Sequence, residues 1–391
     1  MEYKLITELA YTYIGLVTTM TKHYVDEGVP LIFNSSIKVN GIDTSKPVFL
    51  DREFAEKNKN RKHKKNDVVT VHTGDIGVSA VISDELDGSL GFATIVTRIN
   101  DCNILLPEYL CAYLNYGGGK EQLYKYSRDA RNNLNLADYN KLVVPLPEIE
   151  RQYEIVDLVR KLKQVIANRK QELQALDKLI KARFVELFGD PKLNEKGWRT
   201  GVVSKYYEVK GGKRIPKGMG YADKVTNHPY LRATDMKNET IIDDDIHYIE
   251  DDVFEHIKRY TVKGGDIYLT NVGVNLGMAG VIPDKYDGAN LTENAVKLVP
   301  KTEKVIDGLF LAHYINSPGI QDYINERKMS VGVPKLAIFR IETMPLLLPP
   351  MDLQQQFIEF ARQVDKSKVA VQAALEKAQL LFDSLMQEHF G

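Results

Sequence analysis

Cysteine is almost missing from this sequence, in which Cys102 and Cys111 are the only two among 391 residues. Two cysteines are too few for a disulfide framework or for a zinc site built from cysteine. The eight histidines are scattered without the paired spacing of a metal site, so we predict no metal. The two thiols are most simply buried side chains of a protein from a reducing cytosol.

Long apolar runs are also missing. No segment approaches the roughly 20 apolar residues of a membrane span, and the N-terminus, MEYKLITELAYTYIG, lacks the charged and apolar blocks of a signal peptide. These absences predict a soluble, cytoplasmic chain with no membrane partner. An excess of either charge is absent too, because the formal net charge is −1. Any attraction to nucleic acid must therefore come from a local basic surface.

Signatures of catalysis are absent where they could be expected. Residues 316–319, NSPG, lack the second proline and the aromatic residue of an amino-methyltransferase signature. Residues 212–214, GKR, lack the hydroxyl residue and the earlier glycine of a phosphate-binding loop. The glycines of residues 273–280 have the wrong spacing for a dinucleotide site, and residues 283–284, PD, lack the Glu-x-Lys of a nuclease. The sequence predicts a chain that is not an enzyme and holds no cofactor.

What the sequence does contain is an internal repeat. Residues 144–189 and 346–391 align without a gap at an offset of 202, since 391 − 189 = 202. The alignment pairs Gln152 with Gln354 and ends both segments at Phe-Gly. Each segment has the features of one long helix that begins after prolines and ends at glycine. We therefore expect two related surfaces at a fixed separation.

Both predicted helices carry apolar residues at alternating spacings of four and three, which is the coiled-coil period. The predicted seam consists of Ile155, Val159, Leu162, Ile166, Leu173, Leu176, Ile180 and Leu187 in the first helix and Phe357, Val364, Val371, Leu375, Phe382 and Leu385 in the second. Flanking side chains widen the stripe enough to meet a second surface, namely Leu158, Val165, Leu179, Phe184 and Phe188. The alternative is two unrelated surface helices on separate cores, which would not require equal length or the same ending.

The direction of pairing follows from the globular stretch that precedes each helix. If the helices pair, an antiparallel arrangement places these stretches at opposite ends of a rod. At 1.5 Å per residue, about 41 residues give a strut of about 60 Å.

The two globular stretches are themselves related, more weakly than the helices. Residues 77–84, GVSAVISD, match residues 277–284, GMAGVIPD, at an offset of 200, since 277 − 77 = 200. Strands that we expect at 68–71, 91–97, 267–270 and 295–299 alternate with short helices.

These patterns together predict an α+β fold. It has two mixed α/β domains separated by a long antiparallel two-helix coiled coil, as a pseudo-twofold tandem repeat. The predicted boundaries are 1–146 and 190–348 for the domains and 147–189 and 349–391 for the helices.

The chain resembles the specificity subunit of type I restriction-modification systems. The resemblance is carried by the tandem order, by PLPEIERQYEIVDLVRKLKQVIANRKQELQALDKLIKARFVELFGD, and by KGWRTGVVSKYYEVKGGKRIPKG and HPYLRATDM in the second unit. It covers the whole chain, although the first unit has no opening like Gly197-Trp198, which leaves the start of the first domain open.

The resemblance implies a DNA-binding chain without catalysis of its own. Two target recognition domains, 1–146 and 190–348, would each read one half of a split sequence in double-stranded DNA. The helix pair would act as a ruler and dock two methyltransferase subunits, which would carry S-adenosylmethionine, and restriction or motor subunits could join them. Two other classes stay open: a non-enzymatic adaptor that binds proteins through two related domains, and a nuclease or ATPase with unfamiliar motifs.

A basic run in the first domain is the first candidate for DNA contact. Residues 57–65, KNKNRKHKK, contain no apolar spacer, which is typical of a solvated loop, and their six cations are Lys57, Lys59, Arg61, Lys62, Lys64 and Lys65. Their functional interpretation is phosphate contact and the alternative is plain solubility. The expected counterpart in the second domain is Lys213, Arg214 and Lys217, where Gly211 and Gly212 would let backbone amides approach a phosphate unless the segment is an ordinary turn.

Base reading requires forked donors and acceptors on loops. In the first domain the candidates are His72, Thr73, Arg128, Arg131, Asn132 and Asn133, with residues 34–36, NSS, as further ones. In the second domain they are Arg232, Thr234, Asp235, Asn271, Asn275, Arg327, Lys328, Ser330 and Lys335. Capping or surface solvation is an equal alternative for any single side chain, so the prediction concerns the loops.

Overall fold

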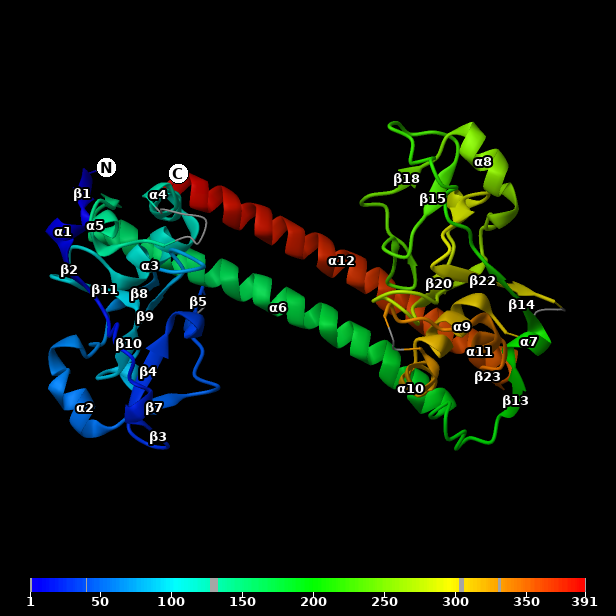
Figure 1. The fold of residues 1–391 in the computed structure, drawn as a ribbon, viewed down its shortest axis with the longest axis horizontal. Helices are drawn as coiled ribbons and strands as arrows, with labels where there is room; N and C mark the ends of the chain where they lie inside the picture. Colours follow the sequence, from blue (N-terminus) through cyan, green and yellow to red (C-terminus); the bar gives the residue numbers. More distant parts are fainter. Residues whose placement is uncertain (1, 40, 127–132, 302–305, 330–331, 391) are drawn as a thin grey trace. The chain divides into compact units, whose positions relative to one another are not determined.

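The chain folds into two compact units in the computed structural model (Figure 1). Unit 1 comprises Met1–Gln171 and Gln372–Gly391, and unit 2 comprises Glu172–Val371. Each unit therefore includes part of both long helices, whereas the sequence assigned each helix to a segment of its own. The structure describes every residue except 1, 40, 127–132, 302–305, 330–331 and 391.

Unit 1 is built from short strands and helices. Its strands are β1 (Glu2–Leu5), β2 (Ala10–Ile14), β3 (Tyr24–Val25), β4 (Val29–Phe33), β5 (Ile37–Lys38), β6 (Gly41–Ile42), β7 (Val48–Leu50), β8 (Val68–Val71), β9 (Ser79–Val81), β10 (Leu90–Phe92), β11 (Thr94–Ile99) and β12 (Val143–Leu146). Its short helices are α1 (Ile6–Leu9), α2 (Arg52–Lys57), α3 (Pro107–Tyr116), α4 (Gly118–Tyr126) and α5 (Leu136–Tyr139), with the 3-10 turns η1 (Thr21–His23), η2 (Asn34–Ser36), η3 (Lys59–Arg61) and η4 (Asp84–Leu86).

Unit 2 repeats this order of strands, except that its described residues include no counterpart of β3. Its strands are β13 (Arg199–Val202), β14 (Tyr207–Gly211), β15 (Pro229–Leu231), β16 (Met236–Lys237), β17 (Thr240–Ile241), β18 (His247–Tyr248), β19 (Ile267–Thr270), β20 (Ala279–Val281), β21 (Asn290–Leu291), β22 (Ala295–Pro300) and β23 (Pro345–Leu348). Its short helices are α7 (Val203–Tyr206), α8 (Asp251–Ile257), α9 (Gly308–Ile315), α10 (Pro318–Arg327) and α11 (Ile338–Glu342), with the 3-10 turns η5 (Lys258–Tyr260) and η6 (Asp284–Tyr286).

The sheets of the two units have matching strand orders, except that β3 of unit 1 has no counterpart among the described residues of unit 2. Unit 1 has an antiparallel sheet β2-β11-β8-β9, a mixed sheet β10-β4-β7-β3 and the pairs β1-β12 and β5-β6. Unit 2 has the antiparallel sheet β14-β22-β19-β20, the mixed sheet β18-β15-β21 and the pairs β13-β23 and β16-β17. Because β1 pairs with β12 as β13 pairs with β23, β1 is the counterpart of β13, the strand that follows Gly197-Trp198.

Local sequence explains the shared elements. The central strands β8 and β19 are buried at every residue, as expected for their runs of β-branched and aromatic side chains. Gly77 and Gly277 both lie at positive φ, +82° and +97°, so the turn before β9 and β20 requires glycine in both units. Asn115 and Asn316 then each bind both backbone groups of one strand residue, Ser79 and Ala279 respectively.

The two long helices are α6 (Ile149–Phe188) and α12 (Met351–Phe390), each of 40 residues. Their bounds differ by 202, since 351 − 149 = 202 and 390 − 188 = 202. Gly189 ends α6 at φ +76°, and its N–H donates to the Val185 carbonyl at 2.8 Å. Every side chain of the predicted seam is buried or half-buried, whereas most of its neighbours on both helices are exposed.

In unit 1, the first part of α6 and the last part of α12 complete the core under α3. Ile155, Val159 and Leu162 of α6 join Phe382 and Leu385 of α12 in one cluster with the sheet and α3. The Phe390 ring lies 5.3 Å from Tyr109 and 5.8 Å from Tyr113 of α3. The helices are therefore part of the unit's core and not an appendage to it.

In unit 2, the last part of α6 packs against the first part of α12. Phe188 lies 5.7 Å from Phe357 between ring centroids, and further back along α6 Asp177 lies 2.7 Å from Lys368. Residue numbers thus rise along one helix as they fall along the other, which makes this pairing antiparallel. Phe310 of α9 also contacts Phe188, at 4.8 Å between centroids, and ties the pair to the sheet.

Some details differ from the sequence predictions. Ala93, at φ +52°, divides the strand expected at 91–97 into β10 and β11. The flanking stripe is covered only in part, since Phe184 and Phe188 are buried but Leu158, Val165 and Leu179 are exposed. Both cysteines are free and half-buried instead of buried. None of the helices described here is long and apolar enough to cross a bilayer.

Candidate nucleic-acid interface

Three predicted side chains of unit 2 converge on one cavity of about 500 Å³. Arg214 follows β14, whereas Arg232 and Thr234 lie on the loop between β15 and β16. The turn between β21 and β22 closes the cavity with Glu293, and Tyr230 of β15 contributes a ring. Segments far apart in the sequence therefore present cations, a carboxylate, hydroxyls and aromatic faces to one space.

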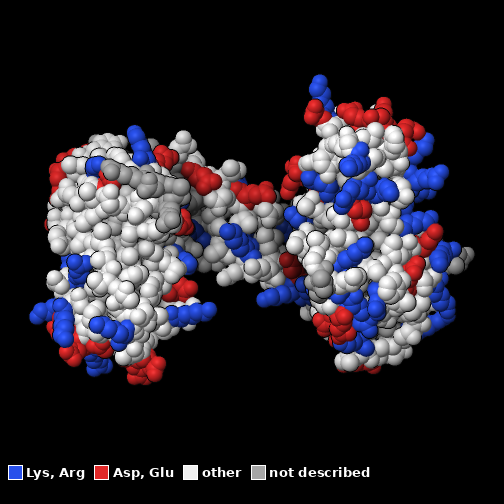
Figure 2. Space-filling view, viewed as in Figure 1, with Lys and Arg blue, Asp and Glu red and all other residues white. Residues whose placement is uncertain are grey.

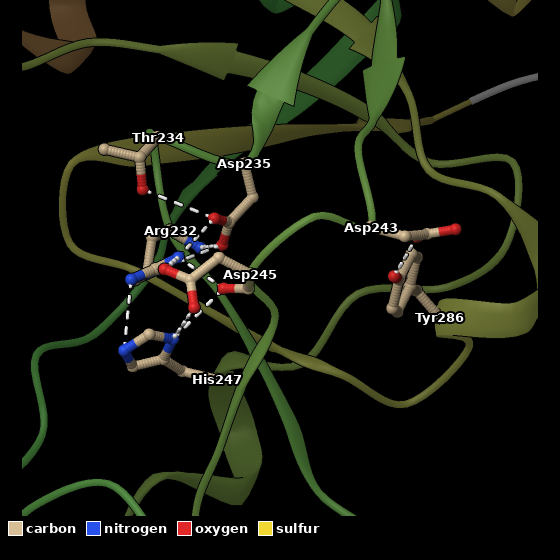
Figure 3. Close-up of polar contacts among 7 residues, drawn as sticks. All are labelled: Arg232, Thr234, Asp235, Asp243, Asp245, His247 and Tyr286. Carbon is tan, nitrogen blue, oxygen red and sulfur yellow. Dashed lines mark hydrogen bonds and ion pairs between the residues drawn. The ribbon is translucent and has the colours of Figure 1, made fainter. Parts of the chain in front are cut away.

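Arg232 is held firmly in this loop (Figure 3). Its Nε and Nη2 donate to the two carboxylate oxygens of Asp235, at 3.2 and 2.7 Å. Nη2 also lies 3.0 Å from an Asp245 carboxylate oxygen, and Nη1 lies 3.2 Å from His247 Nε2. Since its fork is occupied by protein acceptors, Arg232 shapes the loop and does not offer a free bidentate donor. Asp235 is buried, so this predicted reader is also structural.

A second polar contact secures the neighbouring segment (Figure 3). Asp243 accepts hydrogen bonds from Tyr286 and Lys285, and these bonds lower the pKa of the Asp243 carboxyl group. The segment that carries Asp245 is thus tied to η6. The loops around the cavity are preorganised by ion pairs.

Glu293 and Arg214 form a further ion pair at the cavity. Arg214 Nε donates to Glu293 Oε1 at 2.6 Å, and Thr292 Oγ1 donates to Oε2 at 3.2 Å. Burial alone would raise the pKa of Glu293, but the hydrogen bond from Arg214 brings it below its usual value. Glu293 is therefore an ionised acceptor, with lone pairs left for a ligand that donates.

The glycines near Arg214 have a different role from the one predicted. Gly212 N–H donates to the Ala295 carbonyl at 3.1 Å and Lys213 N–H to the Leu291 carbonyl at 2.8 Å. A Cβ on Gly212 would lie 2.0 Å from the Thr292 carbonyl oxygen. Gly212 is thus needed for close approach of two protein segments, and these amides are not free for a phosphate. Lys217 is exposed, and Lys213 lies 5.8 Å from the Tyr260 ring.

A second group of predicted residues in unit 2 meets beside β19. Lys335 pairs with Val272 in an antiparallel bridge, and the Leu336 N–H donates to the Asn271 carbonyl at 2.8 Å. Asn271 itself is buried and its amide donates to the Leu336 carbonyl, which makes it structural. Asn275 is half-buried and Lys335 is exposed.

The end of α10 lies in the same group. The Arg327 guanidinium stacks 3.9 Å from the Tyr323 ring and pairs with Glu326, whereas Lys328 donates to the Asn325 amide oxygen at 2.8 Å. Lys328 thus remains a cation without a carboxylate partner among the described residues, whereas Arg327 is largely occupied.

Unit 1 brings together the corresponding segments. Thr73 pairs with Asn133 in a bridge equivalent to Val272–Lys335, and His72 Nδ1 lies 3.3 Å from Asn133 Oδ1. Thr73 also lines a cavity of about 450 Å³ with Asn34 and Ser35. The predicted segments at 34–36, at 72–73 and at Asn133 of unit 1 are therefore neighbours in the fold. Arg128, Arg131 and Asn132, like Ser330 of unit 2, lie outside the described residues.

The basic run of unit 1 is partly helical and largely paired. Lys57 ends α2 with an ion pair to Glu53, Lys59 and Lys62 face Glu56, and Lys65 faces Asp84. Arg61 Nη1 donates to the carbonyls of Ile14 and Gly15, both at 2.8 Å, and so joins two segments of the fold. Lys64 is exposed.

Charged side chains of both signs are visible on both units (Figure 2). Figure 2 shows lysine and arginine interspersed with aspartate and glutamate on both units. This mixture agrees with the net charge of −1 and indicates that basic surface is local.

Sequence reasoning missed Glu293, Tyr221 and Tyr230. Thr94 of unit 1 and Ala295 of unit 2 have the same register, because Thr94 pairs with Val71 at the end of β8 and Ala295 with Thr270 at the end of β19. Before the turn, the Gly91 and Leu291 carbonyls accept the same backbone hydrogen bond, from Leu16 and Lys213 respectively. The turn of unit 2 is therefore one residue longer, and Glu293 is the middle residue of this longer turn. A comparison of the two repeats that located this extra residue could have drawn attention to Glu293.

Comparisons with known proteins agree with this organisation. Residues 195–380 match a family model described as the type I restriction modification DNA specificity domain. The type I restriction enzyme EcoBI specificity subunit of Escherichia coli is 30% identical over 140 residues, which cover 35% of this chain and 29% of that protein. The EcoKI specificity subunit of Escherichia coli strain K12 is 21% identical over 407 aligned positions, which cover 93% of this chain and 82% of that protein.

The fold is also similar to a solved one. A chain from a structure of the type I restriction-modification system, described for its complex assembly and conformational transition, aligns with a TM-score of 0.65 at 14% identity. The alignment covers 98% of this chain and 96% of that chain, so the likeness of fold includes both units.

Proposed function

We propose, from the match of residues 195–380 to the type I restriction modification DNA specificity domain and from the similarity of the chain to two specificity subunits, that it is a sequence-specific DNA-recognition subunit. The globular parts of units 1 and 2, residues 1–146 and 190–348, would act as target recognition domains. Each would read one half of a bipartite target in double-stranded DNA. We assign no catalysis to this chain.

One observation carries this proposal. The two units share the strand order of the four-stranded antiparallel sheet and the same anchoring contacts, such as those of Asn115 and Asn316, yet they differ at the loops that line their cavities. Glu293 lies in a turn that is one residue longer than its counterpart in unit 1, and Arg232 and Thr234 occupy a loop whose counterpart in unit 1 carries Asn34 and Ser35. Two target recognition domains with different base preferences require the same fold with different loops.

The helix pair would be an antiparallel coiled coil that sets the separation of the two half-sites and docks two methyltransferase subunits. Its support is the covered seam and the antiparallel contacts Asp177–Lys368 and Phe188–Phe357 within unit 2. The methyltransferase partners would supply S-adenosylmethionine, and the complex leaves open whether restriction or motor subunits join it. Because it would act on the DNA of its host, we expect the chain in the cytoplasm.

Methylome sequencing of the host with and without this gene tests the function. We expect one split motif, with two short defined blocks and an unspecified spacer, to be methylated only when the gene is present. Equal methylation in both strains would contradict the proposal. A salt titration of DNA binding separates it from a protein-binding adaptor, because affinity that does not change with salt would favour the adaptor.

The spacer can be tested separately. Deleting residues 167–173 and 370–376 removes one heptad from each helix and shortens the pair by about 10 Å, which is roughly three base pairs. We expect the same two blocks with a spacer shorter by that number. An unchanged spacer would show that the helices do not set the distance. Deletion from one helix alone serves as the control, because it breaks the register of the pair.

A further inference from the structure

Unit 2 exposes three apolar side chains on two adjoining segments. Val274 is 97% exposed, Val333 is 66% exposed and Met329 is 61% exposed. Single exposed apolar residues are ordinary on protein surfaces, whereas a group that contacts no core is a candidate contact surface. We name Val274, Met329 and Val333 the apolar tip.

Backbone hydrogen bonds hold the tip together. The Gly273 N–H donates to the Pro334 carbonyl at 2.9 Å, which places the neighbours Val274 and Val333 on adjoining segments. Met329 and Lys335 exchange two backbone hydrogen bonds, at 2.8 and 3.2 Å. Gly273, at φ +101°, turns the chain so that Val274 projects from the loop. The tip is therefore a built feature and not a loose end.

Cations flank the apolar tip. Lys335 is exposed, and Lys328 donates to a neutral amide, so neither is in an ion pair with another described residue. The apolar tip and its two unpaired lysines are complementary to a polyanion that has apolar groups between its negative charges. Double-stranded DNA has this chemistry, because its major groove presents the C5-methyl of thymine between two rows of phosphates.

Unit 1 carries a different residue at the same place. His72 and Asn271 accept the same backbone hydrogen bond, from Leu134 and Leu336, so the two loops share a register. The glycines that follow, Gly74 and Gly273, are both at positive φ, and after them unit 1 has Asp75 where unit 2 has Val274. An aspartate cannot make the contact that the valine offers.

We propose that Val274 contacts the C5-methyl group of a thymine in the half-site read by unit 2, with Met329 and Val333 at the rim of that contact. This inference rests on the proposed function and adds a specificity-determining residue to it. The contact is apolar and excludes water from the methyl group, so it favours thymine over any base that lacks a methyl there.

Replacement of thymine by deoxyuridine tests the contact, because it removes the methyl group alone. Once the methylated motif is known, duplexes with each thymine replaced singly are titrated with the full chain in complex with its methyltransferase partners. We expect one replacement to weaken binding about fourfold, the effect of losing one apolar carbon group from a buried contact. With Val274→Ala, that replacement should have no further effect.

Val225→Ala is the matched control, since Val225 is a valine of the same unit that is 78% exposed outside the tip. It should retain the full effect of deoxyuridine. Val274 touches no core, so its truncation leaves folding intact, and an unchanged melting temperature checks this.

Two results would overturn the inference: a target whose two blocks contain no thymine, or deoxyuridine effects at every thymine that persist in Val274→Ala. If the wild-type complex showed no sequence-specific binding at all, this result would contradict the proposed function and not only the contact of Val274.

Discussion

Gln152 and Gln354 make the same hydrogen bonds in their two units. Each donates its side-chain amide to a proline carbonyl five residues earlier, Pro147 or Pro349, at 2.9 Å. Each accepts, also at 2.9 Å, the backbone N–H of the residue that precedes a domain helix, Leu106 or Asp307. Both are fully buried. One glutamine thus joins the start of each long helix to its globular domain.

Removal of either glutamine should destabilise its own unit. Gln152→Ala leaves the buried Leu106 N–H and the Pro147 carbonyl without their partner, and Gln354→Ala does the same to Asp307 and Pro349. We expect each substitution to lower the free energy of unfolding by about 1–3 kcal/mol, measured by urea titration. The exposed Gln355, which donates to Glu359, is the matched control, and Gln355→Ala should change stability by less than about 0.5 kcal/mol. An equal loss of stability in all three variants would contradict the role of Gln152 and Gln354 in joining each long helix to its domain.

His63 predicts a pH dependence for unit 1. Burial lowers the pKa of His63 from 6.5 to about 4, and its Nδ1 lies 2.9 Å from Ser89 Oγ. Between these values the unfolded chain binds a proton at this site that the folded chain does not. Stability is therefore full above pH 6.5 and falls as the pH drops to about 4, by up to about 3 kcal/mol.

A comparison of His63→Gln with the wild type isolates this contribution from other titrating groups. Unfolding is followed by urea titration between pH 7 and pH 4.5. The difference in stability between the two proteins should shrink as the pH falls. The exposed His256 provides the control, and His256→Gln should follow the wild type throughout. A constant difference for His63→Gln would contradict the assigned cause.

The sequence predicted the parts of the fold that periodicity determines. The 4-3 spacing and the ungapped repeat located α6 and α12, and runs of β-branched residues located β8 and β19 at their observed bounds. Such elements depend on side chains a few residues apart. The break at Ala93 was missed because it depends on a backbone turn that no local signal marks.

The loops of the candidate site were predicted, but the state of their side chains was not. Arg232 is occupied by Asp235 and Asp245, and Arg61 by the carbonyls of two consecutive residues in one distant segment. Gly212 is needed because the Leu291–Thr292 backbone lies too close for a side chain, and this contact exists only in the folded chain. Residue type indicates what a side chain can bind, whereas tertiary contacts decide whether it is free.

The cations of the interface should differ in their effect on salt dependence. Lys64 and Lys217 are exposed and, in the described part of the chain, are in no ion pair. If each contacts a phosphate, Lys64→Ala and Lys217→Ala will each lower the slope of log K against log salt by about 0.9. Arg61→Ala should instead lower the stability of unit 1 and leave that slope unchanged. The measurement is a filter-binding titration at several salt concentrations, and equal slopes for all four proteins would exclude Lys64 and Lys217 from the contact surface.

Glu293 should determine one base of the half-site read by unit 2. Its carboxylate is ionised and fixed by Arg214, so it can accept from the exocyclic amino group of cytosine or adenine and repels acceptors. Glu293→Gln keeps the size but adds a donor. We expect discrimination at one position to fall by roughly 1–3 kcal/mol, seen as a relaxed base at that position of the methylated motif, with the other block unchanged.

Glu255→Gln is the matched control for this change. Glu255 is an exposed acid of unit 2 that does not line the cavity, and its carboxylate lies 2.6 Å from Lys258 Nζ. It should leave the motif intact. Relaxation of both blocks by Glu293→Gln would indicate a general loss of affinity and not the loss of a base contact. An unchanged motif would mean that the Arg214–Glu293 pair only joins two loops of the fold.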